Sequence, residues 1–302
     1  MKSVIVKNLE KKYGEVKAIE NINFEIDSGE LFGLIGPDGA GKTTIFRIIT
    51  SLLTPSSGKA TLNNLDSVDD YKEVRKIIGY MPGRFSLYQD LTVEENLDFF
   101  ASIFNTTVEQ NYNLIKDIYE HLEPFKKRLA GRLSGGMKQK LALSCALIHA
   151  PEILILDEPT TGVDAVSRKE FWEMLKKLKT KGITIIVSTP YMDEASMCDR
   201  VALIQKGKIL NINTPQNIIK SFEHKLFAVN SDKKQNLIND LRNFEHMNSA
   251  YAFGDSIHYT DKRNDFSEKD LEIYLASKNH SNISIKLIKA NIEDCFMEYM
   301  TK

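Results

Sequence analysis

The stretch LFGLIGPDGAGKTTIFRIITSLL, residues 31–53, contains the most informative pattern of this chain. It starts as a short apolar run, passes through a glycine-rich loop, and continues with apolar residues at helical spacing. Its middle, GPDGAGKT at residues 36–43, matches the pattern GxxxxGK[ST], which surrounds phosphate groups with backbone amides where a strand leads into a helix. A glycine-rich turn with a chance lysine is the alternative, and it leaves the flanking strand and helix unexplained. The stretch therefore predicts an α/β fold of the P-loop NTPase class.

Each residue type in this loop suits a nucleoside triphosphate. Glycines let backbone amides converge on phosphate oxygens, and the start of the helix adds positive potential. Lys42 would reach the β- and γ-phosphates, and Thr43 would offer its hydroxyl to Mg²⁺. Asp38 is an acid within an anion-binding loop, so we expect it to point away from the phosphates. The expected ATP-binding residues of the loop are Gly36, Pro37, Asp38, Gly39, Ala40, Gly41, Lys42, Thr43 and Thr44.

A second motif, ILILDE at residues 153–158, is an apolar run followed by two acids. By itself, such a pattern often marks only the exit of a strand. In a parallel sheet, however, the carboxyl ends of strands meet at one edge, so both acids should lie beside the phosphate loop. There Asp157 suits Mg²⁺ coordination, and Glu158 suits a general base that polarises the attacking water.

Composition limits the alternatives. The chain has 302 residues, 42% of them hydrophobic, and a formal net charge of −1, which gives no electrostatic reason to expect nucleic-acid binding. We find no apolar run near the roughly 20 residues needed to cross a bilayer and no signal-peptide pattern at the start. Three widely spaced cysteines make a disulfide framework or a zinc site improbable and favour a reducing, cytoplasmic setting.

The order of patterns predicts two domains. Residues 1 to 30 alternate like antiparallel strands, the stretch from about 85 to 150 is mainly helical, and strands return afterwards. We expect this first domain to cover 1–218. Residues 219–302 follow the order strand, helix, strand, strand, helix, strand, which is typical of a small ferredoxin-like α+β unit, and a last amphipathic helix follows.

A third motif, LSGGMKQK at residues 133–140, opens a predicted helix. Ser134 suits the N-cap position, and Gly135 and Gly136 would leave amides exposed at the helix start. Spacing alone does not separate an ordinary capped helix from a functional site.

Taken together, the phosphate loop, LSGGMKQK, ILILDE and TTGVDAVSR resemble the ATP-binding cassette (ABC) ATPases, in this order and at this separation. More narrowly, they are similar to the ATP-binding subunits of drug-resistance and ABC-2-type exporters. The resemblance covers residues 1 to 218. It implies a mixed sheet core with an antiparallel β subdomain and an α-helical subdomain, and it implies ATP and Mg²⁺ as cofactors.

The resemblance also assigns residues that the spacing alone does not. Tyr13 falls where the family stacks an aromatic ring on adenine, although an exposed tyrosine at a strand end is the simpler alternative. Asp164 would lie at the centre of a head-to-tail dimer. The signature residues that would bind the γ-phosphate held by the other subunit of that dimer are Ser134, Gly135, Gly136 and Gln139.

Two positions depart from the family pattern. Gly83 stands where the family has a glutamine that contacts Mg²⁺ or water, and Pro190 stands where it has a histidine that contacts the γ-phosphate. Loss of one water-orienting group typically costs about 10²–10⁴ in rate, so we expect this chain's own site to bind Mg-ATP and to hydrolyse it slowly. The alternative is that such relatives tolerate both residues and hydrolyse ATP as homodimers.

The sequence thus predicts an ATPase that serves as the energy-coupling subunit of a membrane exporter, on the inner face of the cell membrane. Its expected partners are membrane-spanning permease subunits and a second ATPase subunit, identical or different, and no nucleic acid. Residues 83–104, with Phe85, Leu87 and Tyr88 expected to be exposed, form the candidate docking groove, and a patch inside the helical lobe is the alternative. Other hypotheses are a soluble ABC ATPase acting on nucleic acid or ribosomes and a nucleotide sensor without turnover.

Overall fold

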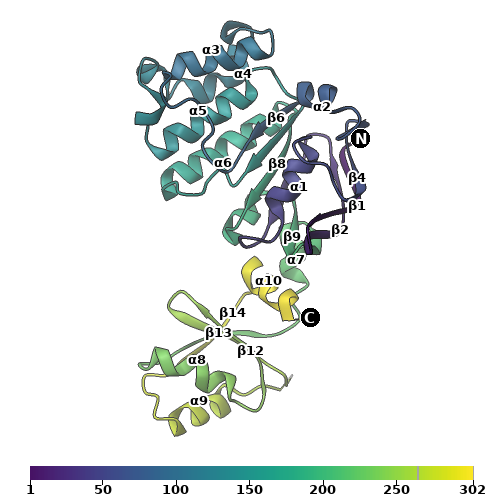
Figure 1. Ribbon diagram of the computed structural model, residues 1–302. Helices are drawn as coiled ribbons and strands as arrows, with labels where there is room; N and C mark the ends of the chain where they lie inside the picture. Colours follow the sequence, from purple (N-terminus) through teal and green to yellow (C-terminus); the bar gives the residue numbers. More distant parts are fainter. Residues whose placement is uncertain (264, 302) are drawn as a thin grey trace. The chain divides into compact units, whose positions relative to one another are not determined.

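The computed structural model describes residues 1–263 and 265–301. The chain divides into two compact units, Met1–Pro215 and Gln216–Lys302. The division lies at the start of helix α7 (Pro215–Lys220), whereas the sequence predicted it between residues 218 and 219. Figure 1 labels the elements of both units.

A six-stranded sheet forms the centre of the first unit (Figure 1). Its order is β10-β9-β3-β8-β7-β6, and all neighbours are parallel except the antiparallel pair β9 and β10. The inner strands are apolar on both faces, as expected for a sheet that is covered on both sides. The bounds are β3 (Leu31–Ile35), β6 (Ile78–Met81), β7 (Ile153–Asp157), β8 (Thr184–Thr189), β9 (Arg200–Gln205) and β10 (Lys208–Asn213).

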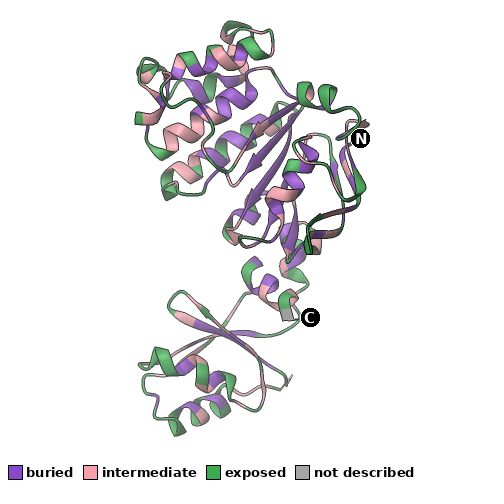
Figure 2. Cartoon of the chain, viewed as in Figure 1, coloured by how far each residue is buried: buried purple, intermediate pink, exposed green. Residues whose placement is uncertain are grey.

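A second sheet is antiparallel, with the order β2-β1-β4-β5. Helix α1 (Lys42–Ile49) packs its apolar side chains into one buried cluster with residues of both sheets. The strands β3, β7 and β8 are buried along their whole length, and Figure 2 shows the buried centre of this unit. The amphipathic helix after the phosphate loop is thereby held on two sides. The strands are β1 (Lys2–Tyr13), β2 (Val16–Asp27), β4 (Ser57–Leu62) and β5 (Leu65–Asp66).

The first helix of the helical subdomain, α3, begins at Val93. Thr92 caps α3 in a capping box with Glu95, in which each side chain accepts from the other residue's backbone N–H. Helix α5 contacts α3, α4 and α6. The helices of the unit are α2 (Tyr71–Ile77), α3 (Val93–Ile103), α4 (Val108–Tyr119), α5 (Gly135–Leu147) and α6 (Ala165–Thr180), with short 3-10 turns η1 (Glu123–Phe125), η2 (Ala130–Arg132) and η3 (Met192–Met197).

The second unit has the predicted ferredoxin-like order. Its antiparallel sheet is ordered β12-β13-β11-β14, and leucines of α8 and α9 pack on one face of it. The elements are β11 (Leu226–Asn230), α8 (Lys234–Arg242), β12 (Met247–Phe253), β13 (Ser256–Asp261), α9 (Glu268–Ser277), β14 (Ser284–Ile288) and α10 (Ile292–Thr301). This unit has its own apolar cluster, separate from that of the first unit.

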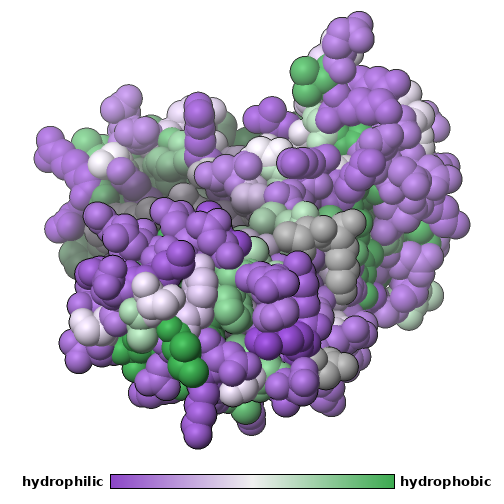
Figure 3. All heavy atoms as spheres, turned by 90° about the horizontal axis from the view of Figure 1, so that it is seen from below, coloured by the Kyte–Doolittle hydropathy of each residue, from purple (hydrophilic) through white to green (hydrophobic). Residues whose placement is uncertain are grey.

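Within residues 1–263 and 265–301, no helix combines the length and the apolar character needed to span a bilayer. The face drawn in Figure 3 carries mainly hydrophilic side chains, with hydrophobic ones in small separate patches. All three cysteines, Cys145, Cys198 and Cys295, are buried and unbridged, and burial raises the pKa of each thiol.

Candidate functional site

The phosphate loop connects β3 to α1, as its sequence predicted. No side chain caps α1. Across the described residues, the amides of Gly39, Gly41 and residues 42–44 have no hydrogen-bond acceptor, whereas Ala40 donates to the Pro37 carbonyl. Amides at the start of a helix that lack acceptors form a site for an anion. The loop therefore offers backbone N–H donors to a phosphate group.

Glycines shape this loop by close approach and by backbone conformation. A Cβ at Gly36 would lie 2.1 Å from the carbonyl oxygen of Ile204, which is far inside contact distance. Gly41 has φ 106°, a conformation that residues with a side chain rarely adopt, and a Cβ there would lie 2.6 Å from Ile19. Only glycine fits at these two positions, which explains their place in the motif.

Lys42 lies folded into the loop. Its side chain is 3% exposed, and its Nζ donates to the carbonyls of Gly36 (2.7 Å) and Pro37 (3.1 Å). The same nitrogen lies 3.1 Å from Oε1 of Glu158, so the lysine and the second acid of ILILDE form an ion pair. Both residues were predicted at one edge of the sheet, but their ion pair was not predicted.

Asp157 is the last residue of β7 and Glu158 follows it, so both acids lie at the carboxyl edge of the sheet. Asp157 is 2% exposed, and its Oδ1 accepts a hydrogen bond from the hydroxyl of Ser188 at 2.5 Å. Glu158 has φ 49°, and its backbone N–H donates to both the carbonyl and the hydroxyl of Ser188. The end of β8 thus orients both acids. Ser188 was not predicted as a site residue, although its place near the end of the neighbouring strand β8 was the available signal.

The donor set suits Mg²⁺ bound together with a nucleotide. No group of three His, Cys, Asp or Glu side chains in the part of the chain that the structure describes forms a metal cage. Mg²⁺ commonly uses one or two protein oxygens plus phosphate oxygens and water. A buried carboxylate at Asp157 and a hydroxyl at Thr43, beside a phosphate-binding loop, are consistent with that mode.

The two positions that depart from the family pattern lie near this edge. A Cβ at Gly83 would lie 3.2 Å from the carbonyl oxygen of Asp157. Pro190 directly follows the last residue of β8, and its ring supplies neither a donor nor an acceptor.

Burial, together with the nearby Asp157, raises the pKa of Tyr80 to about 12, so its hydroxyl stays neutral.

Tyr13, the expected adenine-stacking residue, is the last residue of β1 and is 47% exposed. The Nζ of Lys11 lies 5.6 Å from the centre of its ring. An exposed ring is available for stacking, but the same position is also what an ordinary strand-end tyrosine would adopt.

The signature residues lie at the start of α5. Ser134 is its N-cap and accepts from the Met137 amide at 3.3 Å, as predicted, and Ser134 and Gly135 are both exposed. A Cβ at Gly136 would lie 2.8 Å from Oγ of Ser167, so this helix start packs against the start of α6. Gln139 instead lines a cavity of the helical subdomain. No hydrogen bond or ion pair among the described residues joins the signature to the phosphate loop.

Asp164 caps α6. Its Oδ1 accepts from the amides of Val166 (3.1 Å) and Ser167 (3.0 Å), and hydrogen bonds from Ser167 lower the pKa of this carboxyl. The side chain is therefore ionised at neutral pH, at the start of a helix that touches the signature.

Comparison with known proteins gives a consistent family. Residues 19–161 match the ABC transporter family. The chain is 42% identical over 214 residues to "Probable multidrug ABC transporter ATP-binding protein YbhF" of Escherichia coli, an alignment that covers 70% of this chain and 37% of that relative. It is 36% identical over 218 residues to "Nod factor export ATP-binding protein I" of Burkholderia lata, covering 71% of this chain and 72% of that relative.

Solved structures agree with the sequence relatives. One titled "Structure of ATP binding subunit of ABC transporter" has a TM-score of 0.66 at 29% identity and covers 72% of this chain and 92% of its own. A dimeric post-hydrolysis state of the cassette MJ0796 bound to ADP and Pi has a TM-score of 0.63 at 29% identity, covering 70% and 98%. The predicted fold class is confirmed, and the chain belongs to the family of ABC transporter ATP-binding proteins.

Proposed function

We propose that this chain is the ATP-binding, energy-coupling subunit of a membrane exporter. The proposal rests on one observation. A phosphate loop whose backbone amides lack acceptors lies beside two acids, and Lys42 of the loop pairs with the second acid, Glu158. The names of relatives in drug and Nod factor export support the direction of transport. The subunit would work at the inner face of the cell membrane, because its partners span that membrane.

Different residues of the site would bind ATP and hydrolyse it. Backbone amides of the phosphate loop and Nζ of Lys42 hold the phosphates, while Thr43 and Asp157 supply oxygens to the cation. When bound, Mg²⁺ neutralises charge on the phosphates. Glu158 accepts a proton from the attacking water, and it becomes available for this once a phosphate competes for its present partner, Lys42. Tyr13 offers its exposed ring to adenine.

Two subunits would complete each site. Ser134 and Gly135 are exposed at the start of a helix and therefore suit the γ-phosphate held by a second subunit. Asp164 would lie at the centre of the same interface. A dimer, with an identical or a different subunit, accounts for a signature that no hydrogen bond or ion pair among the described residues joins to its own phosphate loop.

We further propose that the site built on this chain's own loop hydrolyses ATP slowly. Neither Gly83 nor Pro190 has a side chain that can orient water. Hydrolysis depends on such orientation more strongly than binding does, because the amides and Lys42 carry most of the binding. This chain's signature would still serve a faster site on a different subunit.

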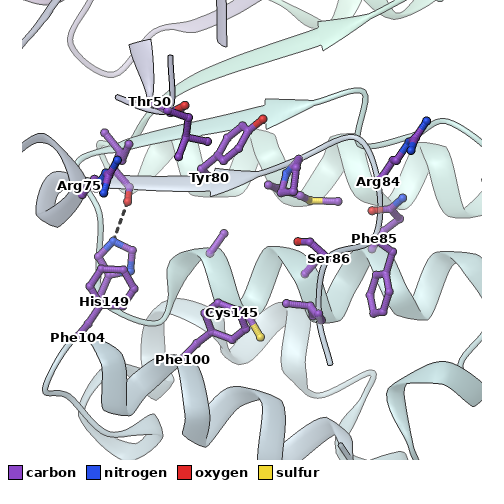
Figure 4. A pocket seen from close by; sticks show the side chains of 18 residues that line it. Thr50, Arg75, Tyr80, Arg84, Phe85, Ser86, Phe100, Phe104, Cys145 and His149 are labelled. Atoms are coloured by element: carbon purple, nitrogen blue, oxygen red, sulfur yellow. Dashed lines mark hydrogen bonds between the residues drawn. The ribbon is translucent and has the colours of Figure 1, made fainter. Parts of the chain in front are cut away.

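A cavity of about 310 Å³ between β6 and the helical subdomain is the candidate docking groove (Figure 4). Figure 4 shows Arg75 with His149 near one end and Arg84 with Phe85 near the other. No acid lines the cavity, so an amphipathic helix with an apolar face and acidic ends fits it. The expectation that Leu87 is exposed was wrong: it lines the cavity and is 8% exposed, because this loop folds inward against the helices.

Purification from membranes tests the exporter assignment. Tagged chain isolated from its native membrane should carry a membrane-spanning protein with it. Leu52 lines the groove and is 56% exposed, so Leu52→Glu should reduce the amount of that protein at least about fivefold without unfolding the chain.

Ile103→Glu is the matched control, because Ile103 is 54% exposed and does not line the groove. Equal recovery with both variants would contradict docking at this cavity. Recovery of ribosomes or nucleic acid in place of a membrane protein would contradict the exporter assignment itself.

A further inference from the structure

One buried acid, Glu194, lies at the junction of three segments of the site. It belongs to the short turn η3 that follows β8 and is 3% exposed. Its Oε2 accepts hydrogen bonds from the hydroxyls of Thr189 (2.5 Å) and Thr160 (3.1 Å), and its Oε1 accepts one from Nε of Arg168 (3.2 Å). A carboxylate buried to this degree is stable only with such partners. We call Thr160, Arg168, Thr189 and Glu194 the Glu194 cluster.

On one side, the cluster reaches the phosphate loop. Thr189 is the last residue of β8, and its carbonyl accepts from the amide of Gly36 at 3.2 Å. Its hydroxyl, besides donating to Glu194, accepts from the amide of Tyr191 at 3.1 Å. The backbone of the loop is thereby bonded to a residue that Glu194 holds.

On the other side, the cluster reaches the start of α6. Arg168 lies in the first turns of that helix, and it also contacts Asp193 (3.1 Å) and the ring of Tyr191, whose centre is 4.4 Å from its guanidinium carbon. The neighbouring Ser167 packs against Gly136 of the signature. A continuous series of contacts therefore joins the phosphate loop to the signature helix.

The segment 158–168 is the part of this series that carries chemistry. It starts with the general base Glu158, includes the dimer residue Asp164, and ends at Arg168. Thr160 and Arg168 attach it to Glu194 near both ends. Pro190, four residues before Glu194 in the chain, makes no side-chain hydrogen bond that could attach it.

We propose that Glu194 is a positioning residue that couples occupancy of the phosphate loop to the segment 158–168. The proposal rests on the function proposed above for Glu158 and Asp164. Because Glu194 bonds to the end of β8 and to both ends of this segment, a shift of the phosphate loop on binding ATP is transmitted to the base and to the dimer face. The coupling is demonstrated by a response of residues 158–168 to a ligand bound at the phosphate loop.

Hydrogen exchange of the intact chain, with and without Mg-ATP, provides that demonstration. In the wild type, Mg-ATP should slow the exchange of amides in the phosphate loop and in residues 159–168, each at least about threefold. Glu194→Gln keeps the size and one acceptor oxygen but loses the charged bond to Arg168. It should retain the response of the phosphate loop and lose the response of 159–168. Glu194→Ala should also raise the ATP-free exchange of 159–168 about tenfold.

Glu173→Gln, at an exposed position of α6, is the control and should respond like the wild type. The proposal is overturned if Glu194→Gln keeps the Mg-ATP response of 159–168, or if the wild type shows protection of the phosphate loop but none of 159–168. Loss of both responses in Glu194→Gln would also overturn it, by showing a general role in folding. A wild type without protection at the phosphate loop would instead contradict the proposed function.

Discussion

Gly83 and Pro190 stand at the reaction edge of the sheet without offering any chemistry to it. Gly83 lies against the carbonyl of Asp157, and Pro190 follows the strand whose Ser188 orients both acids. The carboxylates themselves are intact and held in place. In the function proposed above, the binding groups are therefore complete, whereas Gly83 and Pro190 supply no side chain to orient water.

Restoring both side chains should raise turnover. We expect Gly83→Gln combined with Pro190→His to increase the steady-state ATPase rate of the purified chain about tenfold or more. A Cβ at residue 83 needs its neighbour to yield only by a few tenths of an ångström, so the fold should accept the change. Release of inorganic phosphate measures the rate.

The same double variant carrying Glu158→Gln is the control, and its rate should fall back to that of the parent chain or below. A double variant that binds Mg-ATP as tightly as the parent but hydrolyses it no faster would show that these two positions do not limit hydrolysis.

Single residues were predictable from sequence where a local pattern fixes them. Ser134 caps a helix as expected, because an N-cap depends only on neighbouring residues. Ser188 and Glu194 were not predicted, because each has a partner far away in the sequence. Asp157 lies 31 residues from Ser188, and Arg168 lies 26 residues from Glu194. No local pattern distinguishes a serine at a strand end that orients an acid from one that does not.

At the level of the elements, the helical subdomain contains a histidine, His149, whose pKa burial lowers. His149 follows α5, stacks on Phe104 with ring centres 3.8 Å apart, and its Nε2 lies 2.9 Å from the carbonyl of Ile78. Burial lowers the pKa of His149, and the Ile78 carbonyl opposes this only in part. The folded chain thus binds this proton less readily than the unfolded chain does.

The sign of the pH effect follows. The pKa of His149 is lower in the folded chain than the value of about 6.5 expected in the unfolded chain. The neutral imidazole's contribution to stability is therefore complete above about pH 6.5, and it is lost as the pH falls through the folded-state pKa. We expect the free energy of unfolding to fall between about pH 7.5 and about pH 5.5, and His149→Gln to fall less steeply. Urea denaturation followed by circular dichroism measures both slopes.

Glutamine at the exposed His121 gives the matched control for this comparison. If His149→Gln loses stability with falling pH as steeply as the parent and the control, the buried imidazole is not the group responsible.

The elements themselves were largely predictable, because hydrophobic period and turn residues determine them locally. The ferredoxin-like order of the second unit is an example, and its sheet order β12-β13-β11-β14 has the expected topology. Exposure was harder to predict. Leu87 was expected on the surface and is buried, since the path of the loop after β6 depends on helices far along the chain.

At the scale of the whole molecule, all groups proposed to bind and hydrolyse ATP lie in the first unit. The second unit has its own core and contributes none of them. The proposed function is therefore tested by comparing two properties of the intact chain, its affinity for Mg-ATP and its rate of ATP hydrolysis.

Binding and turnover should be measured on one preparation of the intact chain. We expect saturable binding of Mg-ATP that Lys42→Ala weakens at least about tenfold, and turnover below about 0.1 s⁻¹, whereas enzymes usually reach 1 s⁻¹ or more. Absence of binding would contradict the proposed function. Turnover above about 1 s⁻¹ that Glu158→Gln abolishes would contradict the slow site.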